Sequence, residues 1–418
     1  MKGFIKQKIL YIGAIPFELG GKAAGGIETH CWQLATEACK NGYKVYILTY
    51  GASSFEREKD GVRIISISQN KFTFPLKVFY ALKNWAFIDK NNINHFRFLG
   101  LKDKLIVFYC AYILEKIINY IKPDIIHIHS LLNMNILGLS ILKISSPIVV
   151  TDHGIGVVCN YGTFEKFNLN DKDYLLKKIS LGIKIANYVI SVSNFAKNYL
   201  KKFLDFSDEK KITAILNPLD INKLSVLNKE ELRHELRLEN KKVVFFSGVH
   251  NSIKKKGLDI LLRAFDKNEY LRKTCSLLVV ADKSGLNFAQ NFVKNKNIDI
   301  MLFGPQQWQN VVKFYNVADV FVLPSRTEGI GIVYEESLAI GTPIVGFSES
   351  ISEIEELLGI YVGEKFDANQ EDERNLAEKV IKVLNTDFDR KNVRKKAVEK
   401  LSWESKFCEF ERIYKELR

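Results

Sequence analysis

Short runs rich in β-branched and aromatic residues alternate with longer helical patterns along almost the whole chain, and this alternation constrains the fold more than any other feature. Strands that alternate with helices form parallel sheets covered by helices on both faces. The runs expected to be strands are 8–15, 43–50, 62–68, 124–130, 147–154 and 188–194, then 242–249, 276–282, 298–304, 319–325 and 342–347. The sequence therefore predicts a doubly wound α/β architecture, in which ligands bind at the carboxyl ends of the strands.

The series of strands is interrupted once, by a proline turn at 216–220 and the long polar stretch that follows it. A chain of 418 residues also exceeds the usual size of one hydrophobic core. We therefore expect two doubly wound domains, with the active site in the cleft between them. The predicted boundaries are 1–218 for the first domain, 219–240 for a linker, 241–398 for the second domain and 399–418 for a terminal helix.

The formal net charge is +13, and between Lys71 and Lys104 basic residues are interleaved with aromatic ones. Such a stretch suits an anionic membrane surface, where rings lie at the interface and cations meet head groups. An ordinary pair of helices with a solvated basic face would have the same composition, so both interpretations stay open. Nucleic acid ranks below both, because no nucleic-acid-binding motif accompanies the charge.

Two apolar stretches, 105–121 and 131–150, are broken by charged or amide side chains, so we interpret both as buried helices and not as membrane spans. The N-terminal apolar run is interrupted by Lys6 and Lys8 and lacks a cleavage site, which favours a first strand over a secretion signal. The six cysteines have no paired or metal-binding spacing, as expected of free thiols in a reducing cytosol.

The sequence EGIGIVYEE, from Glu328 to Glu336, places one carboxylate before a glycine-containing turn and another after it. A helix that begins near Gly331 would direct its first backbone N–H groups, near Ile332 and Val333, toward an anion. A carboxylate inside the helix suits the two hydroxyls of a ribose, and a carboxylate in the loop suits the hydroxyls of a sugar. Interaction with the helix dipole would equally explain acidic residues here, so the carboxylates alone leave both interpretations open.

The longer stretch ADVFVLPSRTEGIGIVYEESLAIGTPIV resembles the signature of glycosyltransferase family 4 (group 1), retaining GT-B enzymes that use nucleotide sugars. The resemblance assigns Glu328 to the donor sugar, Glu336 to the ribose and 301–306 to the base. It leaves Glu335 as a spectator whose replacement should be nearly neutral. The donor-binding residues that it implies are Gly25, Gly26, Gly248, Lys256, Gly304, Glu328, Gly329, Ile330, Gly331, Ile332, Val333 and Glu336.

Motifs of the first domain follow in the order of the same family. In GGIETH, Gly25 and Gly26 match the first βα loop, which brings backbone amides to the diphosphate. In TDHG, His153 matches the histidine that these enzymes place beside the donor sugar. The secondary candidates, on the acceptor side, are His127, His129 and Asp152. The resemblance also implies that two Rossmann-like domains face each other across the cleft and that the terminal helix crosses back onto the first domain.

The sequence FSGVHNSIKKKGLDILLRAF resembles the family's glycine-arginine strand end, which is followed by a lysine-glycine pair. Here the chain departs from the family, because Val249 stands where arginine is usual and the segment is two residues longer. The phosphate charge would then be bound by Lys256, with Lys254 and Lys255 as alternatives.

The resemblance implies a mechanism based on charge. Lys256, the helix start after Gly331 and the amides of 25–26 would stabilise the leaving diphosphate, while Glu328 and His153 hold the sugar. Retention could come from a covalent carboxylate intermediate or from attack on the face that the leaving group vacates. The second route is usually favoured for this family, so we assign no nucleophile.

Two D-x-D sequences, 171–173 and 387–389, could hold a metal ion but lie away from the predicted phosphate loops. We expect no essential metal, and no cofactor besides the nucleotide-sugar substrate.

The chain is therefore expected to be a cytoplasmic hexosyltransferase that moves a sugar from a UDP- or GDP-linked donor to a hydroxyl of a glycan or lipid-linked acceptor. The pathway suggested by the resemblance is bacterial surface polysaccharide synthesis, such as capsule or lipopolysaccharide, with the enzyme peripheral on the inner membrane face if 71–104 binds lipid. The alternatives are an epimerase or phosphorylase of the same fold, or a catalytically silent sugar-nucleotide-binding partner subunit, which Val249 makes conceivable. An oxidoreductase is disfavoured because the first loop lacks G-x-G-x-x-G.

Overall fold

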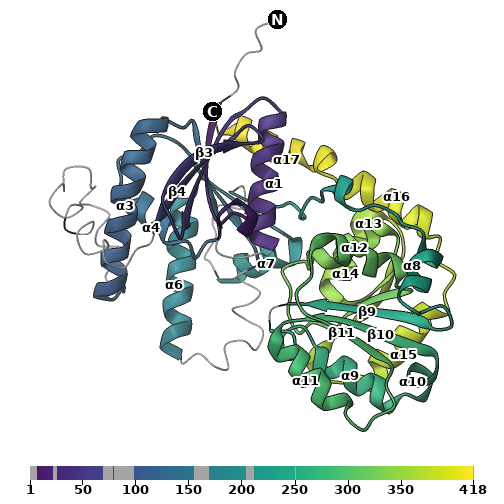
Figure 1. Cartoon of the computed structure of the whole chain (residues 1–418). Helices are drawn as coiled ribbons and strands as arrows, with labels where there is room; N and C mark the ends of the chain where they lie inside the picture. The colour runs from purple at the N-terminus through teal and green to yellow at the C-terminus, as the bar shows by residue number, and fades with distance from the viewer. Residues whose placement is uncertain are drawn as a thin grey trace, which may run out of the picture. The chain divides into compact units, whose positions relative to one another are not determined.

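The computed structural model describes residues 7–21, 26–68, 79, 98–154, 169–203, 211–249 and 251–417. These residues form two compact units, each built around one sheet (Figure 1). Described residues up to Leu216 and from Phe407 onward belong to the first unit, and Asn217–Lys406 belong to the second. The expected α/β architecture is confirmed in both units, whereas the expected cleft between them stays a prediction.

The sheet of the first unit has the strand order β3-β4-β2-β1-β5-β6-β7-β8. Its strands are β1 (Lys8–Ile12), β2 (Lys44–Gly51), β3 (Phe55–Lys59), β4 (Val62–Ser68), β5 (Ile125–His129), β6 (Ile148–Asp152), β7 (Tyr188–Ser191) and β8 (Ile212–Ala214). The strands pair in parallel except β3, which runs antiparallel to β4 at the edge of the sheet. The sequence FEREK of β3 is mostly exposed and carries no apolar run, so the hydrophobic pattern did not predict it.

Helices cover both faces of this sheet. They are η1 (Phe17–Leu19), α1 (Gly26–Lys40), α3 (Leu101–Ile121), α4 (Met134–Ser140), α6 (Leu169–Ile185) and α7 (Asn194–Phe203), with α17 (Trp403–Glu416) from the end of the chain. Leu10 and Ile12 pack in one core with α3, α4 and α6. Tyr11 points to the opposite face, because side chains alternate along a strand, and contacts Tyr414 of α17.

The interpretation of 105–121 as a helix is confirmed by α3. For 131–150 it is wrong in part, because α4 ends at Ser140 and the chain turns before β6 begins at Ile148. No described helix combines the length and the apolar character needed to span a bilayer.

The second unit contains a fully parallel sheet with the strand order β11-β10-β9-β12-β13-β14. Its strands are β9 (Lys242–Gly248), β10 (Cys275–Ala281), β11 (Ile300–Phe303), β12 (Val320–Leu323), β13 (Ile344–Phe347) and β14 (Gly363–Phe366). Its helices are η6 (Ile221–Lys223), α8 (Lys229–Glu235), α9 (Leu258–Lys267), α10 (Glu269–Thr274), α11 (Lys283–Val293), α12 (Trp308–Val317), α13 (Ile332–Ile340), α14 (Ser348–Leu358), η7 (Ala368–Gln370), α15 (Glu373–Leu384) and α16 (Arg390–Leu401).

Residues 219–240, expected as a linker, belong to the second unit and include η6 and α8. The guanidinium of Arg233 donates to the Val317 carbonyl and pairs with Asp319, 2.6 Å away. Lys229 pairs with the same carboxylate at 2.7 Å. The polar composition that suggested a linker therefore reflects charged side chains that attach α8 to the start of β12.

Candidate active site

In each sheet the strand order reverses beside the first strand of the unit: between β1 and β5 in the first unit, and between β9 and β12 in the second. Loops that leave the two central strands at such a point diverge, and the space between them is where doubly wound sheets bind ligands. In the second unit these loops carry Lys256, after β9, and Glu328, after β12.

Lys256 and Glu328 form a largely buried ion pair. The Lys256 Nζ lies 2.5 Å from Glu328 Oε1, and the Ser325 hydroxyl donates to the same oxygen over 2.6 Å. The side chains are 19% and 8% exposed. Burial by itself raises the pKa of Glu328, but the Lys256 ammonium, the Ser325 hydroxyl and Lys255 together bring the pKa below its ordinary value. Glu328 is therefore an ionised carboxylate already held in place.

The lysine run resolves into three different environments. Lys254 pairs with Asp259 at 2.9 Å and its side chain is 70% exposed. Burial lowers the pKa of Lys255, the charge of Glu328 raises it and that of Lys256 lowers it, so Lys255 lies within electrostatic range of the ion pair. A side chain at Gly248 would approach the Lys256 Cβ to 3.1 Å, so the glycine at the end of β9 lets Lys256 pack closely on the strand.

Helix α13 begins at Ile332, with Gly331 as its N-cap at φ +79°, as the sequence predicted. Tyr334, in its first turn, is fully buried and donates its hydroxyl proton to the Leu323 carbonyl over 2.5 Å. The Phe347 amide donates to the same hydroxyl over 3.0 Å. Tyr334 thus fixes the helix start to the carboxyl ends of β12 and β13, and the positive end of the helix dipole lies beside the loop of Glu328.

The two glutamates inside α13 differ in their surroundings. Glu336 is partly buried and accepts a hydrogen bond from the Tyr315 hydroxyl over 2.9 Å; burial raises its pKa to about 8. Glu335 is fully buried, and neither of its carboxylate oxygens has a hydrogen-bond partner among the described residues. Burial raises the pKa of Glu335 well above its ordinary value, and Glu336 and Glu353 raise it further. Glu335 therefore lies in the core and not on the surface, and the nearly neutral effect expected of its replacement stays a prediction.

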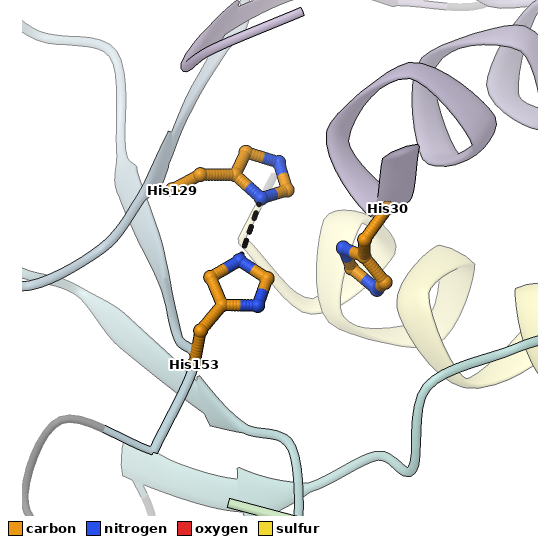
Figure 2. A group of neighbouring side chains, drawn as sticks. All are labelled: His30, His129 and His153. Carbon is orange, nitrogen blue, oxygen red and sulfur yellow. Dashed lines mark hydrogen bonds between the residues drawn. The ribbon is translucent and has the colours of Figure 1, made fainter. Parts of the chain in front are cut away.

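At the carboxyl ends of β5 and β6 in the first unit, three imidazoles face one another (Figure 2). His129 Nδ1 lies 3.1 Å from His153 Nε2, and the two rings stack with centroids 5.4 Å apart. His30, from α1, meets both rings edge-on, with centroid distances of 5.6 and 5.2 Å. Burial lowers the pKa of His153 to about 4, so the imidazole is neutral at pH 7.

The secondary candidates take up different positions. His127 is fully buried, with Nδ1 2.8 Å from the Tyr414 hydroxyl and Nε2 2.7 Å from the Thr151 hydroxyl. Asp152 is buried and accepts a hydrogen bond from the Gly154 amide over 3.1 Å. The structure therefore brings His129 beside His153, but makes His127 a core residue and gives Asp152 the role of holding a turn.

Two family models cover most of the chain. The model described as Glycosyltransferase Family 4 matches residues 24–223, and the model described as Glycosyl transferases group 1 matches residues 228–400. The chain belongs to glycosyltransferase family 4. It is accordingly an enzyme of the hexosyltransferase type.

Similar proteins agree with this assignment. An uncharacterized glycosyltransferase of Methanocaldococcus jannaschii is 25% identical over 97% of both chains. A capsular polysaccharide biosynthesis glycosyltransferase of Staphylococcus aureus is 25% identical over 58% of this chain and 64% of its own. An alpha-monoglucosyldiacylglycerol synthase of Streptococcus pneumoniae is 24% identical over 77% of this chain and 67% of its own.

Solved structures show the fold of this glycosyltransferase. A sucrose-phosphate synthase from Thermosynechococcus elongatus matches with a TM-score of 0.73 at 17% identity, over 99% of each chain. An Anabaena protein, HepE, solved in complex with UDP-glucose, matches with a TM-score of 0.69 at 14% identity, over 98% of this chain and all of the other. These likenesses establish the GT-B fold for the glycosyltransferase.

The remaining predicted residues of the glycosyltransferase are distributed around the second sheet and the first loop. Gly329 and Ile330 lie in the turn between β12 and α13, and Gly304 follows β11 at the sheet edge. Gly26 opens α1, while Gly25 lies outside the described residues. Of the D-x-D residues, Asp173 pairs with Lys177 and Asp389 caps α16.

His30 was not among the site residues predicted from the sequence of this glycosyltransferase. The residue stands within GGIETH, about one turn into the helix that follows the first strand. Its position four residues after Gly26, at the switch point of the sheet, was the available signal, because a side chain there faces the carboxyl ends of the central strands.

Proposed function

We propose that this glycosyltransferase moves a sugar from a UDP- or GDP-linked donor to a hydroxyl of a glycan or lipid-linked acceptor, with retention of configuration. The observation that carries the proposal is the Lys256–Glu328 pair beside the start of α13, where a cation, a carboxylate and a helix N-terminus converge. The UDP-glucose complex of the structurally similar HepE supports a UDP-linked donor as the first to test.

The ion pair suggests how the donor is received. The diphosphate of the donor binds Lys256, and a hydroxyl of the donor sugar donates to Glu328. The ion pair between Lys256 and Glu328, 2.5 Å long, is thereby replaced by two contacts with the substrate. As the bond from the anomeric carbon to the diphosphate breaks, Lys256 and the α13 N-terminus stabilise the growing negative charge. The acceptor oxygen bonds to the anomeric carbon on the vacated face and its proton passes to the leaving phosphate. The place of His153 beside the sugar stays a prediction of the resemblance.

A screen of nucleotide sugars by thermal shift tests the donor class, because a ligand that binds only the folded state raises the melting temperature. Donors that raise it are then incubated with acceptors. Transfer or slow hydrolysis releases the nucleoside diphosphate, an epimerase releases none, a phosphorylase requires phosphate, and a silent binder only shifts melting. If no nucleoside-diphosphate sugar shifts the melting temperature, the proposal is wrong. Activity that EDTA abolishes and Mg²⁺ or Mn²⁺ restores would overturn the expectation of no essential metal.

Glu336 makes donor binding depend on pH. Its pKa of about 8 means that the carboxyl is mostly protonated at neutral pH, whereas the ionised form accepts both ribose hydroxyls better. Donor affinity, measured by calorimetry, should rise between pH 7 and pH 9 in the wild type and change much less in Glu336→Gln. The same pKa shift has the opposite effect on stability. Between pH 4.5, the ordinary pKa of a glutamate, and about pH 8, the unfolded state releases a proton that the folded state keeps. The free energy of unfolding therefore falls as the pH rises through this range.

Val249 stands where the family usually has an arginine, and Lys255 supplies the positive charge that this arginine would provide. Replacing Lys255 with alanine should lower kcat/KM for the donor by roughly 10- to 100-fold, the loss expected for one hydrogen bond between charged groups. The matched control is Lys254→Ala, whose side chain is 70% exposed and paired with Asp259, and which should remain near the wild type. Equal losses of kcat/KM in both variants would contradict a specific role for Lys255 and would show that the three lysines act only through their total charge.

The surface polysaccharide pathway and a peripheral position on the inner membrane face are part of the proposal, supported by relatives named for capsule and glycolipid synthesis. The basic and aromatic stretch on which membrane binding depends begins at Lys71, and its residues 71–97 lie outside the described residues, Phe79 excepted. Binding to anionic vesicles should weaken with salt and be lost when Lys71, Lys77, Lys83 and Arg97 are replaced together. Binding that survives this replacement would exclude the stretch.

A further inference from the structure

We propose that His30, His129 and His153 form a binding site for a divalent transition-metal ion of the Zn²⁺ class. One nitrogen from each imidazole belongs to a group whose members all lie within 4.8 Å of one another. The three residues come from three different elements of the first unit: α1, the end of β5, and the turn after β6 (Figure 2). Three imidazoles with one open position are a common protein ligand set for zinc.

The distances are close to those that an ion requires. Zinc-bound nitrogens lie 2.0–2.1 Å from the metal, so two of them in a tetrahedral site are about 3.3 Å apart. His129 Nδ1 and His153 Nε2 are already 3.1 Å apart. Because all the ligand atoms lie within 4.8 Å of one another, no pair has to approach by more than about 1.5 Å to reach that value.

Hydrogen bonds do not fully explain why His129 is buried. His129 is only 2% exposed, and its Nε2 has no hydrogen-bond partner within the described part of the chain. A neutral imidazole has one donor and one acceptor nitrogen, and the proximity of Nδ1 to His153 accounts for one of them. An ion bound through Nδ1 leaves Nε2 as it is, so it is the convergence of three buried imidazoles, and not this nitrogen, that points to a metal ion.

The residues behind the group hold it in position. The His127 ring stacks on His129 with a centroid distance of 5.1 Å and an interplanar angle of 13°. His127 is itself fixed by Tyr414 on one nitrogen and Thr151 on the other. Metal sites depend on such outer residues to orient their ligands.

The chemistry of the ligands limits the choice of ion. Asp152, the carboxylate next to His153, already accepts the Gly154 amide. A ligand set made of imidazoles favours Zn²⁺, Ni²⁺ or Cu²⁺ and disfavours Mg²⁺ and Ca²⁺, which prefer oxygen. His153 is the least buried of the three, so exchange with solvent is expected on its side. An ion and a donor sugar would both use His153, so the site is tested in the absence of donor.

The experiment uses the full chain without a polyhistidine tag, stripped with EDTA and dialysed. Co²⁺ is titrated in as the probe, and its visible absorption reports the coordination; Zn²⁺ and Mg²⁺ are then tested as competitors. We expect one equivalent of Co²⁺, displaced by Zn²⁺ and not by Mg²⁺. His30→Gln and His129→Gln should each weaken binding by at least tenfold. The matched control, His234→Gln, changes a histidine of the second unit whose side chain is 85% exposed, and should bind like the wild type.

Melting temperatures provide a readout independent of the Co²⁺ spectrum. Zn²⁺ should raise the melting temperature of the wild type and of His234→Gln, and should leave that of His30→Gln unchanged. Melting curves without metal show whether each variant folds. If His129→Gln does not fold, the proposal is tested with His30→Gln alone. Co²⁺ binding of equal strength in the wild type and His30→Gln, or no stoichiometric binding by the wild type, overturns the proposal. Neither outcome affects the proposed transferase function, because no activity is measured.

Discussion

Replacing Glu328 with alanine should lower kcat by roughly 10²- to 10³-fold, the loss expected when one preorganised charged contact to the reacting group is removed. Glu328 is held by Lys256 and Ser325 before any substrate binds, so the sugar meets a carboxylate whose position is already fixed. Loss of this contact acts on orientation in the transition state, and KM for the donor should change less than kcat. Steady-state kinetics with the donor found by thermal shift provide the measurement.

Two further variants make the Glu328 test specific. Glu328→Gln keeps a hydrogen-bond acceptor without the charge and should recover part of the lost kcat. Glu269→Ala removes an exposed glutamate of the same unit, paired only with Lys273 on its own helix among the described residues, and should leave kcat unchanged. If Glu328→Ala chiefly raised KM and kept kcat, Glu328 would serve ground-state binding and not the reacting sugar.

Replacing Tyr334 with alanine should lower the unfolding free energy by about 3–5 kcal/mol, because a fully buried aromatic side chain is removed from the second unit. Tyr334→Phe should cost about 1–3 kcal/mol, since it leaves the Leu323 carbonyl and the Phe347 amide without their shared hydroxyl. Denaturant unfolding gives both values. We also expect Tyr334→Phe to raise KM for the donor, because the start of α13 loses its attachment to β12 and β13.

Tyr361→Phe is the matched control for the hydroxyl. Its ring is 45% exposed and its hydroxyl donates only to Glu364 among the described residues, so its removal should change the unfolding free energy by less than about 0.5 kcal/mol. A Tyr334→Phe variant as stable as this control would mean that the α13 N-terminus is positioned by packing alone.

The buried strands could be predicted because a strand covered on both faces must be apolar throughout, as IIHIH of β5 and VFVL of β12 illustrate. β3, β8 and β14 were not predicted, because all three lie at sheet edges; β3 and β14 carry polar residues, and β8 has only three residues. The segment 219–240 was interpreted as a linker for a related reason. Its charges are satisfied by tertiary partners such as Asp319, which a local pattern cannot reveal.

The candidate site divides in the same way. The start of α13 was predicted from the glycine spacing, and the resemblance assigned Lys256 and Glu328 to one donor site, but their ion pair was not predicted. The choice of lysine could not be predicted, because Lys254 forms an ion pair with Asp259, a residue that is not part of the motif. The burial of Glu335 also depends on contacts distant in sequence, so two adjacent glutamates looked equivalent when they are not.

The contact of Tyr414 with Tyr11 and His127 has a consequence for how the protein is made. A ribosome releases the chain from its N-terminus, and domains generally begin to fold as they emerge. The second unit is almost continuous in sequence, from Asn217 to Lys406, whereas the first needs Phe407 and the residues after it. The strands synthesised first must therefore wait for the last helix, and the unit that begins the chain is the last to complete its core.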